Sequence, residues 1–187
     1  MKLALALINS EEWYGRGPEG LDDHLDVPGW LDGFLVGSGL SAEPPSPSSR
    51  EQARLRRLRA LLRRMYGALA DGREPTGADV EELDAFLRRG VLYRRLEADD
   101  GYQVVLGSVK QDWDWVLSQI AASFGELLAD GERARIKLCE NPECQWAFYD
   151  ESRNRRRRWC NSAECGNVFK VRNFRARQRA QQRRDPT

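Results

Sequence analysis

The segment CENPECQWAFYDESRNRRRRWCNSAEC, residues 139–165, decides the fold of the C-terminal part of this chain. It contains all four cysteines, Cys139, Cys144, Cys160 and Cys165, as Cys-x4-Cys, fifteen intervening residues and a second Cys-x4-Cys. Zinc prefers four tetrahedral ligands at about 2.0–2.3 Å, and two short loops with two thiolates each meet that geometry with little strain. We therefore predict one structural zinc ion bound by these four residues.

Two other interpretations of the cysteines are two disulfides, in one of three pairings, or free buried thiols. All four cysteines lie within 27 residues, and the first 138 residues contain none. A secreted protein usually spreads its disulfides through the chain, so this clustering favours a metal. Four thiolates leave no open coordination position, which makes the predicted site structural rather than catalytic.

The residues around the cysteines predict a small α+β fold. Pro142 favours a tight knuckle between Cys139 and Cys144. We expect residues 146–149 and 157–159 to pair as a short β-hairpin, and a helix to run from about 162 to 183, with its N-terminal dipole facing the anionic metal site. Knuckle, hairpin and helix together describe a treble-clef-like zinc finger.

Charge is distributed unevenly along the 187 residues. From Arg133 to the end there are 15 Lys and Arg against 6 Asp and Glu, a net +9, whereas the remainder has 15 against 23, a net −8. An acidic body with a basic C-terminal part is typical of proteins that bind nucleic acids or acidic surfaces.

Two basic elements carry this charge. One is the loop between the cysteine pairs, and the other is the predicted helix, on which four arginines lie within about 80° of one another. We expect Val171 and Phe174, on the opposite helix face, to pack on the hairpin. The predicted phosphate or base contacts are Arg153, Asn154, Arg155, Arg156, Arg157, Arg158, Arg172, Arg175, Arg179 and Arg183.

Other roles for these side chains stay open. The arginines also suit a solvated charged surface or a surface for an acidic protein partner, including the N-terminal part of this chain, although nucleic acid is the favoured partner. Loop arginines and aromatic residues also suit RNA or single strands. The aromatic residues Trp146, Phe148, Tyr149 and Trp159 are predicted to form the small core of the zinc module rather than to stack on bases.

The first 132 residues predict a mainly helical domain with one β-hairpin. Apolar periodicity and capping signals indicate helices near 3–9, 28–37, 50–70, 77–89 and 110–130. Residues 91–97 and 102–106 read as a hairpin around Asp99-Asp100-Gly101, and 15–20 and 41–49 as loops. In the fourth helix we expect a Thr76–Asp79 capping box and Val80, Leu83, Phe86 and Leu87 facing inward. The domain division is then 1–132 and 133–187.

The N-terminal domain is predicted to sense a signal or to dimerise. Asn9, Trp13, Asp26 and Trp30 are candidates for a ligand pocket, since they combine polar and aromatic groups in a loop-rich region. The alternative is that both tryptophans belong to the core and that His24 is a surface residue. No nucleophile pairs with the single histidine and no phosphate-binding loop occurs, so we do not expect an enzyme.

The first eight residues resemble the opening of a signal peptide, but their apolar run stops at Asn9 and no small-residue cleavage site follows. A first buried element is the expectation. No segment is apolar enough to span a membrane, and a cytoplasmic protein is expected.

With these residues in hand, the chain resembles a bacterial family of predicted stress-induced transcription regulators, which join an N-terminal "ABATE" domain to a C-terminal "CGNR" zinc finger. The matching residues are Cys139, Cys144, Phe148, Asp150, Ser152, Arg153, Asn154, Arg158, Trp159, Cys160, Cys165, Gly166, Asn167, Lys170 and Arg172, with Asn9, Ser10, Asp26, Trp30 and Leu31 upstream. The resemblance implies DNA-binding regulation and adds Asn167 and Lys170 to the candidate contacts. Val168 stands where the family has the Arg of its name.

The sequence therefore predicts a zinc-dependent DNA-binding transcription regulator with a possible small-molecule inducer and a possible homodimer. An RNA or single-strand binding protein and a zinc-stabilised protein–protein adaptor are the alternatives.

Overall fold

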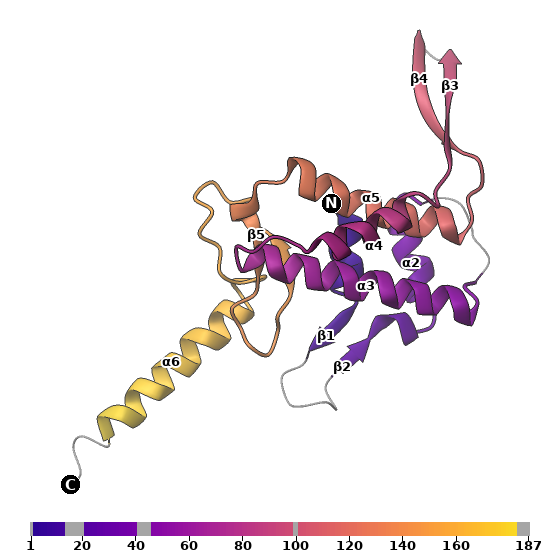
Figure 1. Cartoon of the computed structure of the whole chain (residues 1–187). Helices are drawn as coiled ribbons and strands as arrows, with labels where there is room; N and C mark the ends of the chain where they lie inside the picture. Colours follow the sequence, from indigo (N-terminus) through magenta and orange to yellow (C-terminus); the bar gives the residue numbers. More distant parts are fainter. Residues whose placement is uncertain (1, 14–20, 41–45, 99–100, 183–187) are drawn as a thin grey trace.

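The computed structural model describes residues 2–13, 21–40, 46–98 and 101–182. The predicted loop at 15–20 and residues 41–45 of the predicted linker lie outside these ranges. The described chain is mainly helical, with small antiparallel strand pairs (Figure 1). The helices are α1 (Lys2–Ile8), α2 (Trp30–Gly37), α3 (Ser49–Ala70), α4 (Gly77–Leu87), α5 (Trp113–Asp130) and α6 (Cys165–Gln182), with short 3-10 turns η2 (His24–Asp26) and η3 (Arg133–Arg135).

Six strands form three separate antiparallel pairs in the described residues. They are β1 (Glu11–Trp13) with β2 (Leu21–Asp23), β3 (Leu92–Ala98) with β4 (Tyr102–Ser108), and β5 (Ile136–Leu138) with β6 (Ala147–Tyr149). The predicted hairpin after α4 is confirmed, whereas the pairing of β1 with β2 was not foreseen. These two strands contain only three residues each, too few for a periodic pattern to emerge.

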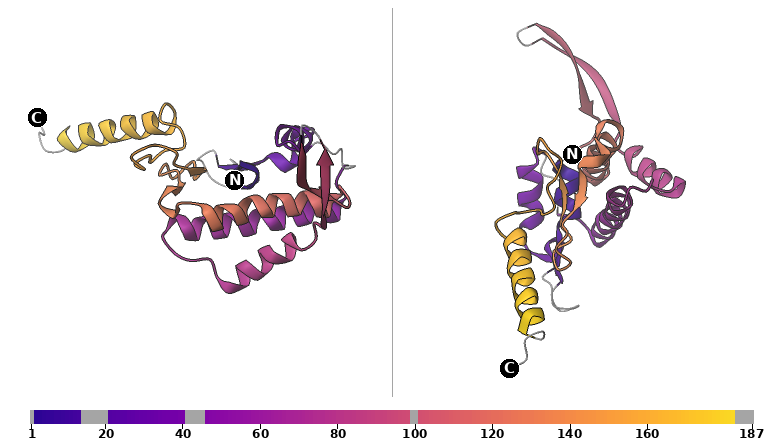
Figure 2. Two further views of the ribbon diagram at one scale, coloured as in Figure 1. Left: turned by 90° about the horizontal axis from the view of Figure 1, so that it is seen from above. Right: turned by 90° about the vertical axis from the view of Figure 1, so that its left-hand side faces the viewer.

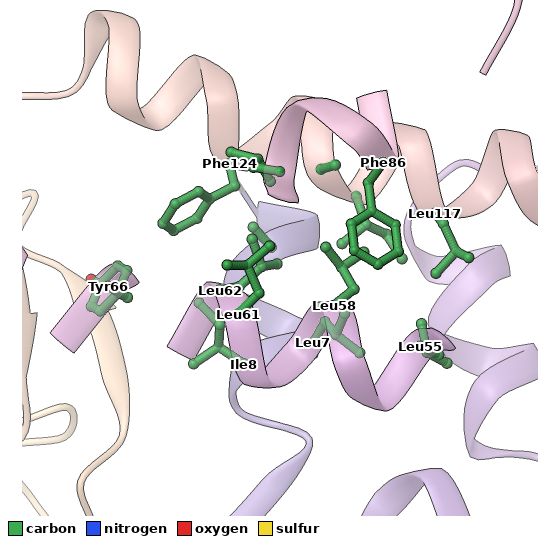
Figure 3. Packing of buried hydrophobic residues seen from close by; sticks show 14 of the residues in the cluster. Leu7, Ile8, Leu55, Leu58, Leu61, Leu62, Tyr66, Phe86, Leu117 and Phe124 are labelled. Carbon is green, nitrogen blue, oxygen red and sulfur yellow. The ribbon is translucent and has the colours of Figure 1, made fainter. Parts of the chain in front are cut away.

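The hydrophobic core lies between α1, α3, α4 and α5. The two long helices α3 and α5 run side by side (Figure 2), and α1 packs against both. Leu58 and Leu62 of α3 meet Leu7 of α1 and Leu117 and Phe124 of α5, all fully buried (Figure 3). This apolar contact is what holds the helical domain together, since each helix has one apolar stripe that must be covered.

The helix ends follow the chemistry of capping. The predicted Thr76–Asp79 capping box is present, and Ser48 and Glu51 form a second one at the start of α3. In α4, Leu83 and Phe86 are buried as predicted, but Val80 is 50% exposed, so its inward placement was wrong. The side chain that α4 buries near its start is instead Asp79, which bonds to Thr76 and Arg64.

The strand pairing around the zinc-binding segment differs from the prediction. β6 pairs with β5, Lys137 opposite Phe148, and residues 157–159 form no strand. β5 occupies this position because Ile136 is buried in the main core, where Ala147 of β6 joins it. Residues 157–159 still run past the knuckle, and the backbone N–H of Glu140 donates to Arg158 O at 3.1 Å.

Helix α6 begins at Cys165 and extends away from the rest of the protein (Figure 1). Val171 and Phe174 are 48% and 61% exposed, so the prediction that they pack on the hairpin was wrong. Phe169 packs on Trp159 near the start of α6, and the helix beyond it extends away from the described body of the protein, which leaves Val171 and Phe174 exposed.

Two buried side chains join β5 and β6 to the helical domain. Asn9 Nδ2 donates to Ala147 O at 2.9 Å, and Asn9 Oδ1 accepts from Ala147 N at 2.8 Å. The Tyr66 hydroxyl donates to Phe148 O at 2.6 Å, and burial raises the pKa of that phenol well above its ordinary value. The core therefore continues across residue 132, and the division into domains 1–132 and 133–187 stays a prediction.

Replacing Asn9 with Ala should lower the free energy of unfolding by about 1–3 kcal/mol, because the N–H and C=O of Ala147 would be left buried without partners. Urea denaturation of the full chain measures this change. Asn173→Ala, at an exposed position of α6, is the matched control and should be neutral. Equal stability of the two variants would contradict the bridging role of Asn9.

Candidate functional site

The four cysteines lie together at one point, between the knuckle and the start of α6. Their Sγ atoms are all within 4.8 Å of one another, with Cys144 to Cys160 at 3.5 Å and Cys160 to Cys165 at 3.7 Å. A disulfide needs about 2.05 Å, and all four cysteines are unpaired. A tetrahedron of thiolates around zinc, each at about 2.3 Å, has sulfurs about 3.8 Å apart. The arrangement fits one zinc ion, as the spacing predicted.

The electrostatics of the four thiols favour a bound cation. Burial and the neighbouring charge of Cys139 raise the pKa of Cys144 to about 12. Zinc binds thiolates, so a bound ion would displace these protons and neutralise part of the anionic cluster. Each cysteine is at least partly buried, which makes the centre closed and structural.

Local backbone geometry aims the sulfurs at this point. In the knuckle, Cys144 N–H donates to Asn141 O at 2.9 Å, and Gln145 adopts a left-handed φ of 49°. At the other pair, Gly166 lies against Trp159: a Cβ there would be 3.1 Å from the Trp159 ring. The glycine after Cys165 therefore lets the helix start close to the tryptophan.

Asn141 links the metal centre to α6. Its Nδ2 lies 3.6 Å from Cys165 Sγ, and its Oδ1 accepts from Glu143 N at 3.3 Å and from Arg172 at 3.5 Å. Arg172 also forms an ion pair with Glu143. A ligand sulfur, the knuckle and the second turn of the helix are thus held by one amide.

The arginine-rich loop, residues 152–158, is folded around an ion pair that sequence reasoning missed. Lys137 Nζ donates to the carboxylate of Asp150 at 2.6 Å and to the carbonyls of Arg155 at 2.5 Å and Arg157 at 3.0 Å. Asp150, fully buried, also accepts from Ser152 N at 3.0 Å and Arg157 N at 2.9 Å. Burial alone would raise the pKa of Asp150, but the hydrogen bonds from Lys137 and Ser152 outweigh it and lower the pKa well below 3.8.

Some of the predicted contact arginines have partners within the protein. Arg157 donates to the carbonyls of Trp159 and Cys160, with its guanidinium 4.9 Å from the Phe148 ring centroid. Arg158 pairs with Glu140 and stacks over Trp159, and Arg155 pairs with Glu132. Together with Arg172, these residues hold the module's shape. Their structural roles were not visible from the sequence, because the acidic partners of Arg155, Arg158 and Arg172 lie in other segments and Arg157 bonds to backbone carbonyls.

The remaining basic residues point to solvent. Within the described part of the chain no ion pair involves Arg153, Arg156, Lys170, Arg175 or Arg177, and all five are exposed, as are Asn154 and Asn167. Asn167 caps its own turn by donating to Ala163 O at 2.7 Å. Arg177 was missing from the predicted set, although its position on a basic helix was signal enough. The side chain of Arg179 and all of Arg183 lie outside the described residues.

Val168 lies on the arginine face of α6. At 100° per residue it falls within about 40° of Arg172 and within about 20° of Arg175. It is 41% exposed. The position where the family has Arg is therefore part of this basic face, interrupted in this chain by an apolar side chain.

Three of the four predicted ligand-pocket residues have partners within the protein, and the pocket itself stays a prediction. Asn9 is buried with both amide atoms bonded to Ala147, Asp26 pairs with Arg56, and Trp30 stacks on Phe34 at 5.3 Å. The side chain of Trp13 lies outside the described residues. A cavity of about 300 Å³ occurs elsewhere, on α3 and α4, lined by Arg50, Arg54, Arg57, Glu82, Ala85, Phe86 and Arg89.

Fold and site define a class of protein: a helical domain that carries a small four-cysteine zinc finger with a projecting basic helix. Comparison with family models specifies it further. The ABATE model, described as "Putative stress-induced transcription regulator", matches residues 2–131, and the CGNR zinc finger model matches residues 135–178. The chain belongs to this family, and the resemblance found in the sequence is confirmed. Both matched models are of regulatory or zinc-finger type rather than enzymes.

A search of curated proteins found no match to the chain. In the described part of the structure, no helix combines the length and apolarity that a membrane crossing needs.

The purified full chain should contain about one zinc per molecule by elemental analysis. Cys144→Ser should lose most of the zinc and part of the helical circular-dichroism signal, since α6 begins at a ligand. Ser162→Ala, in the exposed turn between two ligands, should keep both. A chain that keeps its helix and contains no zinc would contradict this assignment.

Asp150→Asn should loosen the arginine-rich loop, because Lys137 would lose its carboxylate partner. A loss of about 2 kcal/mol would raise the open population roughly thirtyfold. Limited trypsin digestion measures this, since the loop contains five arginines. Asp71→Asn, at an exposed ion pair with Arg73, should leave the cleavage rate unchanged.

Proposed function

We propose that this chain is a zinc-dependent, DNA-binding transcription regulator in which the zinc finger contacts DNA through its exposed basic residues. The observation that carries the proposal is the division of the arginines into two sets. One set is tied to carbonyls and acids of the module, and the other set, with Arg153, Arg156 and Arg175, is exposed on the elements that the first set holds in place.

This arrangement suits phosphate binding for an energetic reason. A loop held by buried hydrogen bonds loses little conformational entropy when it binds, so its arginines can neutralise phosphates at low cost. Each neutralised phosphate releases counterions, which favours binding at low salt. The guanidinium fork also grips phosphate oxygens bidentately.

The form of helix α6 favours double-stranded DNA over single-stranded nucleic acid as the ligand. It projects freely, is 18 residues long and has exposed side chains around its circumference, as expected of a helix that enters a major groove. The aromatic rings that would stack on single-stranded bases are engaged elsewhere: Phe148 is buried, and Trp159 packs on Phe169 at 4.6 Å.

The signal-sensing part of the proposal concerns the helical domain. The cavity on α3 and α4 has four arginines and one glutamate in its lining, so an anionic small molecule is the class of inducer that it favours. The domain also sits directly on β5 and β6, through which a change in its packing would reach the zinc finger.

The experiment is a salt series of duplex-DNA binding by the full chain, followed by fluorescence anisotropy between about 50 and 200 mM salt. The double variant Arg153→Ala/Arg156→Ala should reduce the log–log slope by about 1.8, at about 0.9 for each phosphate. Arg88→Ala, at the exposed arginine that follows α4, is the matched control and should leave the slope unchanged.

Val168→Arg should act in the opposite direction and tighten binding, because it completes the basic face of α6. Binding that does not depend on salt would overturn the proposal and favour a protein-binding adaptor. Stronger binding to RNA or single strands than to duplex would favour the alternative nucleic-acid function.

A further inference from the structure

The β3–β4 hairpin is the most exposed apolar element in the described structure. It stands away from the helical body (Figure 1, Figure 2), and neither strand contributes to the hydrophobic core. An isolated two-stranded hairpin is marginally stable in water, and large exposed apolar patches in soluble proteins mark interaction sites. The hairpin therefore needs a partner.

The strand register places the apolar residues on one side. Leu92 pairs with Ser108, Arg94 with Leu106, Leu96 with Val104 and Ala98 with Tyr102, and paired residues share a face. We name this side the apolar face. Its members Leu96, Val104 and Leu106 are 65–66% exposed, and Tyr102 is 82% exposed.

On the opposite side of the hairpin, neighbouring side chains cover more of the surface. Tyr93 lies over Gly107, where a Cβ would meet its ring at 2.8 Å, and Arg95 forms an ion pair with Glu97. Val105 and Gly107 are only partly exposed. The apolar face is thus the side that needs covering, although valines at the hairpin's base, Val91 and Val109, are also exposed.

We propose that two copies of this chain form a homodimer by packing the apolar faces of their hairpins against each other. The only charged residue on this face is Arg94, so a second copy brings few charges to be desolvated. Packing the two faces together would cover about 500 Å² of surface on each copy. Tyr102 would account for about 150–250 Å² of this area, and the exposed side chains of Leu96, Val104 and Leu106 would supply most of the rest. The total of about 1,000 Å² is the lower end for specific interfaces.

The two copies can be related by a two-fold axis that lies in the interface, perpendicular to the strands, and passes over the Leu96–Val104 pair. With this axis, the apolar face of one copy fits the same face of the other. The axis places Leu96 on Leu96 and Val104 on Val104 of the second copy, and it reverses the strand direction. Arg94 then lies over the small Ala98 of the second copy and beside its Tyr102, where a cation–π contact is available. The two Arg94 residues stay apart, and the two helical bodies lie at opposite ends of the paired hairpins.

This dimer does not depend on the proposed function. If the zinc finger does bind DNA, the dimer presents two such modules related by a two-fold axis, which suits a palindromic site.

Sedimentation velocity of the zinc-loaded full chain, from about 1 to 100 µM, tests the proposal. We expect a dimer for the natural sequence and a monomer for Leu96→Glu, with dissociation raised roughly thirtyfold or more. Leu96 is already mostly exposed, so the variant should fold, and circular dichroism checks this. Gln103→Glu adds the same charge on the opposite face of the hairpin and should stay dimeric.

Two substitutions of one residue test the two-fold arrangement. Tyr102→Arg places like charges beside Arg94 of the second copy and should dissociate the dimer more than Tyr102→Glu, which offers Arg94 an acid. A monomeric natural protein at 100 µM, or a dimer unchanged by Leu96→Glu, would overturn the proposal. Dissociation by Gln103→Glu as strong as by Leu96→Glu would also overturn it. Because the readout is molecular mass, it stands apart from any result on DNA.

Discussion

The ion pair between Lys137 and Asp150 is the interaction on which the C-terminal module depends. The two residues lie on β5 and just after β6, and their remaining hydrogen-bonding capacity is used by the backbone of the arginine-rich loop. The positive charges of the five arginines repel one another, so that this loop needs a specific interaction to hold it in one conformation. The Lys137–Asp150 pair provides this interaction, because any other loop conformation would leave the two charges without their hydrogen-bond partners, at a large cost in free energy.

The zinc site and this ion pair each hold a different part of the basic surface in place. The metal centre fixes the knuckle to the start of α6, and Asn141 extends that link to Arg172. The Lys137–Asp150 pair fixes the loop to the strands. Arginines that appear equivalent in the sequence therefore have unequal roles: Arg157 and Arg158 complete the scaffold, and Arg153 and Arg156 are presented by it.

Much of this arrangement could be predicted from the sequence, and the failures have a common cause. Helix positions, the Thr76 cap and the four metal ligands follow from local spacing, which a sequence displays directly. The strand partner of β6 and the environment of Val171 and Phe174 depend on what lies opposite in space. β5 lies beside β6 because Ile136 of β5 is buried in the main hydrophobic core, among side chains of the helices. Asp150 was visible as a family residue, but its function required the position of Lys137.

The amide of Asn9 has a consequence for the order in which the protein is made. Its two bonds join the end of the first helix to Ala147, 138 residues later in the chain. During synthesis the Asn9 amide cannot make these two bonds until Ala147 has left the ribosome. Contacts that close so long a loop form late and slow the folding of small domains. The helical domain therefore reaches its final packing only when the strand that follows the first two zinc ligands has arrived.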